Sequence, residues 1–203
     1  AAPNGWVMEY YVGKDYSLGG ITLLCRFDGQ RVTMASQMAE ADETVSSLYS
    51  VKSEQATMLS FDTYNYLVHY FGQPQGSMSD DPNGTLGGDY EFIISSASAE
   101  RIELKGKKYG NRIVMKALSE DQTWKQYLTK IKKVEDDAFF YEYDLLMDGL
   151  YTGQMLRSNY TFIVTYYDEI GKVHQKTVPF MFTADGMRFH EPVTIDGQTM
   201  QNF

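Results

Sequence analysis

Three histidines, His69, His174 and His190, and one cysteine, Cys25, are the side chains best suited to metal or nucleophilic chemistry. No two of the histidines have the i, i+4 spacing with which a helix presents a zinc pair. Cys25 alternates with apolar residues in a run that is typical of a strand, so we expect a buried and unreactive thiol. We expect ordinary structural roles for the histidines, with His174 exposed on its strand.

A loop rich in Asp and Gly, residues 79–89, raises the question of a calcium site. When Gly84 is aligned with the invariant glycine of an EF-hand, the twelfth position is Tyr90, where that motif needs a bidentate glutamate. A hairpin loop is therefore favoured. The alternative is a calcium site of another type, formed by three carboxylates: Asp80, Asp81 and Asp89.

Motifs of catalysis are missing from the sequence. It contains no G-x-S-x-G, no G-x-G-x-x-G and no phosphate-binding P-loop pattern. We therefore predict a protein that is not an enzyme, with no catalytic residues, no metal and no cofactor. A hydrolase whose site forms only in the folded chain is an alternative.

The charge balance bears on partners. With 18 Lys and Arg against 27 Asp and Glu, the formal charge is −9. Such a chain lacks the basic footprint that a phosphate backbone requires, so we predict no nucleic-acid partner. The one basic cluster, Lys105-Gly106-Lys107-Lys108, reads as a solvated turn between two strands.

Alternation of apolar and polar residues predicts strands over most of the chain. In the first run Trp6, Met8 and Tyr10 share one face, with Glu9 on the opposite face. About eight such runs lie between positions 5 and 118 and are joined mostly by short turns. They predict a mainly β fold, either an antiparallel up-and-down (lipocalin-like) barrel or an orthogonal sandwich.

Two helices are expected to interrupt the strands. Thr63 is expected to cap a short helix that reaches Phe71. The second helix follows a capping-box pair, Ser119 and Gln122. Its apolar stripe should pack on the sheet and consists of Trp124, Tyr127, Leu128 and Ile131.

After position 138 the alternation resumes and predicts four further strands. We divide the chain into an eight-stranded barrel-like domain over residues 1–118, a helix and acidic connector over 119–137, and a C-terminal β unit over 138–203. The last unit either packs on the first or extends it.

Aromatic residues make up 14% of the chain, and they are the feature of the sequence that most favours a binding function. Rings that face outward can stack on sugars or cover a partner surface, although large rings also fill barrels. Since loops at barrel ends commonly carry function, we predict a ligand site at the barrel mouth near Tyr64, Tyr66 and His69, flanked by residues 76–88.

Several phrases of the sequence occur together in one family. They are Asn4-Gly5-Trp6, Tyr10-Tyr11, residues 19–23, residues 59–65, His69-Tyr70-Phe71, residues 87–92 and residues 102–107. With these phrases the chain resembles a family of uncharacterised Bacteroidetes lipoproteins, a domain of unknown function. The resemblance covers nearly the whole chain and is densest between positions 4 and 118.

That resemblance implies an exported protein, periplasmic or at the cell surface, tethered to the outer membrane by an N-terminal lipid anchor that this chain lacks. It also implies an accessory role beside SusC- and SusD-like uptake proteins. We therefore predict a non-enzymatic envelope lipoprotein that captures a nutrient: a glycan, a peptide or a small apolar ligand. A structural or assembly subunit of an uptake complex, with no small ligand, is the second hypothesis.

Overall fold

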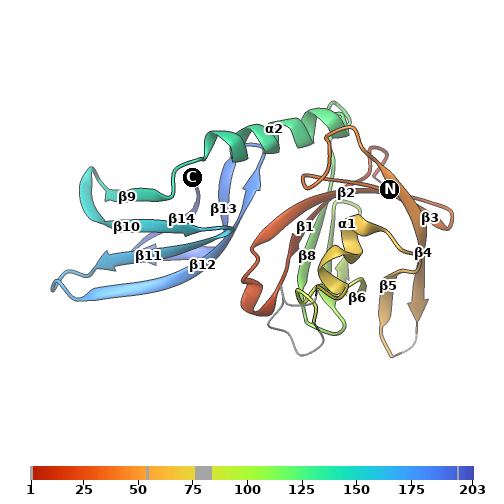
Figure 1. The fold of residues 1–203 in the computed structure, drawn as a ribbon, viewed down its shortest axis with the longest axis horizontal. Coiled ribbons are helices and arrows are strands. Elements are labelled where there is room, and N and C mark those ends of the chain that lie inside the picture. The colour runs from red at the N-terminus through yellow and green to blue at the C-terminus, as the bar shows by residue number, and fades with distance from the viewer. Residues whose placement is uncertain (1, 54, 76–83, 196) are drawn as a thin grey trace.

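Eight antiparallel strands close into a barrel in the computed structural model, which describes residues 2–53, 55–75, 84–195 and 197–203 (Figure 1). β1 pairs with β2 on one side and with β8 on the other, which closes the ring and decides between barrel and sandwich. The strands are β1 (Trp6–Tyr11), β2 (Gly20–Asp28), β3 (Arg31–Ser36), β4 (Val45–Ser53), β5 (Thr57–Phe61), β6 (Glu91–Ala97), β7 (Arg101–Gly106) and β8 (Arg112–Ala117).

Among the described residues, a buried hydrophobic core occupies the interior of the barrel. Most of the side chains that the alternation predicts to face inward do so, whereas Val51 and Tyr90 are exposed. The inward side chains form one buried cluster that includes Met8, Tyr10, Leu23, Cys25, Met34, Phe61, Phe92 and Met115. The ring of Tyr10 meets that of Phe92 edge to face, with centroids 5.8 Å apart. One end is filled by Leu67 and Phe71, from the helix α1 (Tyr66–His69) and the 3-10 turn η2 (Tyr70–Gly72).

Both predicted helix caps are wrong by a few residues. Asn65, not Thr63, caps α1, because its side chain accepts a hydrogen bond from the amide of Leu67. The hydroxyl of Thr63 accepts instead from the amide of Leu48, so it ties the loop to β4.

The long helix α2 (Trp124–Asp137) also begins later than predicted. Its capping box is Thr123 with Gln126, not Ser119 with Gln122. The segment before the helix is held as a loop, because the side-chain amide of Asn4 donates to the carbonyl oxygens of both Ser119 and Gln122.

The C-terminal unit has six strands in the described chain where the sequence predicts four. They follow one another as an antiparallel meander: β9 (Glu142–Met147), β10 (Leu150–Ser158), β11 (Thr161–Tyr167), β12 (Val173–Thr183), β13 (Gly186–Ile195) and β14 (Gln198–Asn202). β10 and β14 escape prediction because Gly153 interrupts the alternation of the first, and the second is short and polar. Their core is built on Phe162, Phe180 and Phe189.

The two units touch where β2 begins. Met181 of β12 pairs with Gly20 in a single parallel bridge. Next to it, a Cβ atom on Gly19 would lie 2.3 Å from the Cβ of Tyr160 and 2.6 Å from the carbonyl oxygen of Phe180. Gly19 also has a φ of +67°, so only glycine fits this contact without strain.

α2 runs above both units and joins them (Figure 1). Trp124 and Leu128 pack with Val7 and Leu24 on the outside of the barrel. One turn later Ile131 belongs to the core of the C-terminal unit. Within the described residues, no helix has the length and apolar character needed to cross a bilayer.

Candidate ligand-binding site

A cavity of about 770 Å³ lies outside the barrel, between its wall and the C-terminal unit. The wall contributes β1, β2 and the end of β8, α2 lies along another side, and the hairpin between β12 and β13 closes the third. A volume of this size is in the usual range for small-molecule sites. The charged residues of the lining are Glu9, Lys116, Lys130, Asp185 and Arg188.

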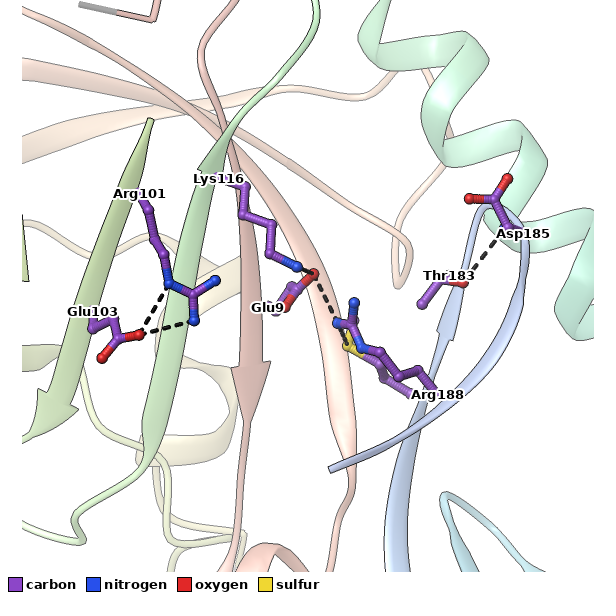
Figure 2. Close-up of polar contacts among 8 residues, drawn as sticks. Glu9, Arg101, Glu103, Lys116, Thr183, Asp185 and Arg188 are labelled. Carbon is purple, nitrogen blue, oxygen red and sulfur yellow. Dashed lines mark hydrogen bonds and ion pairs between the residues drawn. The ribbon is translucent and has the colours of Figure 1, made fainter. Parts of the chain in front are cut away.

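Glu9 is the centre of the polar lining (Figure 2). It points outward from β1, as the alternation predicts, but the C-terminal unit covers it and leaves its side chain 11% exposed. Lys116 Nζ on β8 lies 2.8 Å from Glu9 Oε1, and Arg188 Nη2 on β13 lies 2.7 Å from the same oxygen. A second contact of Arg188 Nη2 is the sulfur of Met181, at 3.1 Å.

The phenols around this group respond to burial and to its charges. Burial raises the pKa of Tyr11 to about 12, with the positive charge of Arg188 acting in the opposite direction. Burial also raises the pKa of Tyr127 on α2, and the negative charge of Glu9 adds to that rise. For Arg188 burial lowers the pKa, but Glu9 outweighs it and the pKa is raised. Tyr11 and Tyr127 are thus neutral hydrogen-bonding groups beside a permanently charged guanidinium.

The residues predicted to bind ligand lie elsewhere, near α1. The ring of His69 lies 5.6 Å from that of Tyr64 and stacks on Tyr90 at 4.7 Å. The hydroxyl of Tyr66 donates a hydrogen bond to Glu43 instead. The structure thus brings Tyr64 and His69 together. Both lie outside the cavity between the barrel and the C-terminal unit, which we call the junction cavity. The role of the three residues as ligand contacts stays a prediction.

Of the three carboxylates suggested for calcium, Asp80 and Asp81 lie outside the described residues. The carboxylate of Asp89 is buried and accepts hydrogen bonds from the backbone amides of Lys108, Tyr109 and Asn111, at 2.7 to 3.2 Å. Asp89 thus organises the turn between β7 and β8. No group of three or more His, Cys, Asp or Glu side chains in the described chain is placed to hold a metal ion.

The remaining chemically capable side chains are dispersed. Cys25 is buried inside the barrel as predicted, and burial raises the pKa of its thiol. His174 is not fully exposed as expected: it is half-buried, stacks on Tyr166 and lies 2.9 Å from Asp168 Oδ2. His190 lies between the rings of Tyr11 and Tyr16, 4.4 and 4.3 Å away.

The cavity residues Glu9, Lys116 and Arg188 were not identified from the sequence. One signal was available: Glu9 is the single charged residue in a strand, Trp6–Tyr11, that is otherwise apolar or aromatic. Arg188 had no such signal, because it comes to Glu9 from near the other end of the chain.

Fold and cavity together define a closed eight-stranded antiparallel barrel with an appended β meander and a polar cavity at their junction. The chain belongs to the family of the domain of unknown function DUF4302, whose model matches residues 1–203. Comparisons with curated proteins and with solved structures found no match.

Proposed function

We propose that this protein is a non-enzymatic binding protein that holds a small ligand in the cavity between the barrel and the C-terminal unit. One observation carries the proposal. The barrel interior is filled by its own side chains, whereas the junction leaves about 770 Å³ open and lines it with charged and hydroxyl groups. Ligand sites commonly form where two units of a protein meet.

The geometry at the junction supports a site of defined shape. Two neighbouring contacts fix the C-terminal unit against the barrel, namely the strand bridge between Met181 and Gly20 and the Glu9–Arg188 ion pair. α2 adds a third support because it packs on both units. A cavity framed on several sides needs little rearrangement to bind a ligand, which favours affinity.

The proposed setting is the cell envelope. The resemblance to Bacteroidetes lipoproteins supports an exported protein, lipid-anchored to the outer membrane and working beside SusC- and SusD-like proteins in nutrient capture. In that setting the ligand is a glycan fragment, a peptide or another small nutrient. Localisation of a tagged full-length protein by membrane fractionation tests this part of the proposal independently of the ligand.

A ligand screen read by amide chemical shifts tests the binding role. Glycan, peptide and organic-acid libraries are added to isotope-labelled protein, and we expect a hit to shift the amides of cavity residues such as Thr22 and Gly186. Ala184→Trp, which places a large ring in the lining, should abolish the shifts. Ala99→Trp, in the exposed β6–β7 turn, is the matched control. Hits that map only to the α1 surface would move the site to Tyr64 and His69, and a screen without hits would contradict the proposal.

A second candidate function, an assembly subunit of an uptake complex, is favoured by a different observation. The outer face of the β9–β12 sheet exposes large apolar side chains in cross-strand pairs, and these are Leu146 with Tyr151, and Tyr167 with Val173. Exposed apolar surface of this kind commonly marks a protein contact. Co-purification from native membranes, compared with a Leu146→Ser, Val173→Ser double variant, distinguishes this role from ligand capture.

A further inference from the structure

The charges beside the cavity do not balance. Glu9 supplies one carboxylate, and two cations, Lys116 and Arg188, bind the same oxygen atom of it. Two positive groups that converge on one oxygen also repel each other. The group as a whole therefore keeps one unit of positive charge at the edge of the cavity.

Burial makes this excess charge consequential. The side chain of Arg188 is 20% exposed and that of Glu9 is 11% exposed, whereas the side chain of Lys116 is 40% exposed. Water screens the charge of Arg188 less than it screens the charge of Lys116, so Arg188 attracts an anion more strongly than it would on an open surface.

The rest of the lining leaves this excess of one positive charge unchanged. Lys130 of α2 adds a third cation, and Asp185 at the tip of the β12–β13 hairpin adds a second carboxylate. The cavity thus has three cations and two carboxylates in a chain whose formal charge is −9. Tyr127 and Phe203 give the same cavity aromatic surface.

We infer that the cavity takes a small organic anion, whose carboxylate or phosphate group binds Lys116 and Arg188 while its apolar part lies against Tyr127 and Phe203. This inference rests on the proposed function and names its ligand class. Lys116 and Arg188 neutralise the anion jointly, because Glu9 offsets only one of their two positive charges. Lys130 on the facing helix strengthens the positive potential.

Two anionic probes and one neutral probe that matches the shape of the carboxylate test the inference. Phenylacetate, phenyl phosphate and the neutral phenylacetamide are titrated into the protein and followed by amide shifts at the cavity. We expect both anions to bind at least about tenfold more tightly than the amide, since hydrogen bonds to charged groups are much stronger than neutral ones. Added sodium chloride should weaken the anions and leave the amide unchanged.

Charge variants of the lining sharpen the test. Lys116→Gln leaves the Glu9–Arg188 pair intact and should weaken phenylacetate binding about tenfold. Lys130→Gln should weaken it less, and Lys132→Gln, on the same helix but outside the lining, should leave it unchanged. Glu9→Gln should act in the opposite direction and tighten binding, because it removes the competing carboxylate.

The outcomes separate the two proposals. If phenylacetamide binds the cavity as tightly as phenylacetate, or if Lys116→Gln has no more effect than Lys132→Gln, the inference is wrong and the binding function stands. If neither these probes nor the library compounds shift the cavity amides, both are wrong. Tighter binding by Glu9→Gln, together with weaker binding by Lys116→Gln, would support the inference.

Discussion

Two of the ion-paired carboxylates on the outer wall of the barrel, Glu9 and Glu103, have different surroundings (Figure 2). Glu103 on β7 accepts from both Nε and Nη2 of Arg101, at 3.0 and 2.8 Å, with the two side chains 42% and 44% exposed. Glu9 on β1 contacts two cations, at 2.8 and 2.7 Å, and is 11% exposed. Both carboxylates point outward from a barrel strand, but only Glu9 is covered by a second unit.

This difference shows that the contribution of an ion pair to stability depends more on the burial of its charges than on its distances. Water stabilises Arg101 and Glu103 nearly as well apart as together, so their contact adds little. Arg188 has lost most of its hydration, so it depends on Glu9 for stabilisation. Glu9 therefore connects the barrel to the C-terminal unit, whereas Glu103 forms a solvent-exposed pair within the barrel.

Glu9→Gln should have the largest effect on stability. It keeps the shape of the side chain but leaves Arg188 half-buried without a counter-charge, and the expected loss is about 3 kcal/mol in the free energy of unfolding. Urea denaturation of the whole chain measures it. A loss below about 1 kcal/mol would mean that water reaches Arg188 freely and that Glu9 resembles Glu103 after all.

Gly19→Ala should come next, because it disturbs the other contact between the units. The new methyl would overlap Tyr160 and the carbonyl of Phe180, and we expect a loss of about 2 kcal/mol. Gly29→Ala is the control: it also has a positive φ, but nothing lies within 4 Å of the added Cβ. The control should cost about 1 kcal/mol from backbone strain alone. Equal losses in the two variants would contradict a close contact at Gly19.

Two histidines give a smaller, pH-dependent effect. Burial lowers the pKa of His69, and burial together with the charge of Arg112 lowers that of His190. As the pH falls below the usual histidine pKa near 6.5, these histidines are protonated in the unfolded chain before they are protonated in the folded chain. The free energy of unfolding therefore decreases as the pH is lowered below about 6.5. The urea concentration at the midpoint of unfolding should decrease as the pH is lowered from 7.5 to 5.5. The double variant His69→Gln, His190→Gln should show a smaller decrease. An unchanged slope would assign the effect to other groups.

Glu103→Gln should have the smallest effect. Because its partner Arg101 is exposed, we expect less than about 1 kcal/mol from the same urea measurement. High salt should remove even this difference, whereas the effect of Glu9→Gln should persist. A loss of stability as large as that caused by Glu9→Gln would mean that burial by the C-terminal unit does not strengthen the Glu9 ion pair.

Alternation along the chain predicted the barrel well, because each strand has one face in a continuous apolar core. Met8, Cys25 and Phe92 are buried as the pattern indicates. The same pattern placed Glu9 on the outer face and could not say what covers that face. Periodicity reports the side of a strand on which a residue lies, whereas its neighbours there depend on contacts between distant segments.

The site near α1 and the cavity between the two units differ in how far apart their residues lie in the sequence. Tyr64 and His69 are close in sequence, so local reasoning could group them, and the structure does bring their rings together. The junction cavity draws its lining from segments at both ends of the chain and from α2 between them. A site of that kind has no local sequence signature, and only the folded chain shows it.

The position of α2 also has a consequence for cooperativity. Leu128 is fully buried in the cluster on the barrel wall, Ile131 is fully buried in the meander core, and Tyr127 packs against both clusters. These side chains lie on two successive turns of the same helix, so neither unit can melt without removing support from the helix segment that the other needs. Barrel and meander should therefore melt in one calorimetric transition, with the helix as the element that makes two cores behave as one.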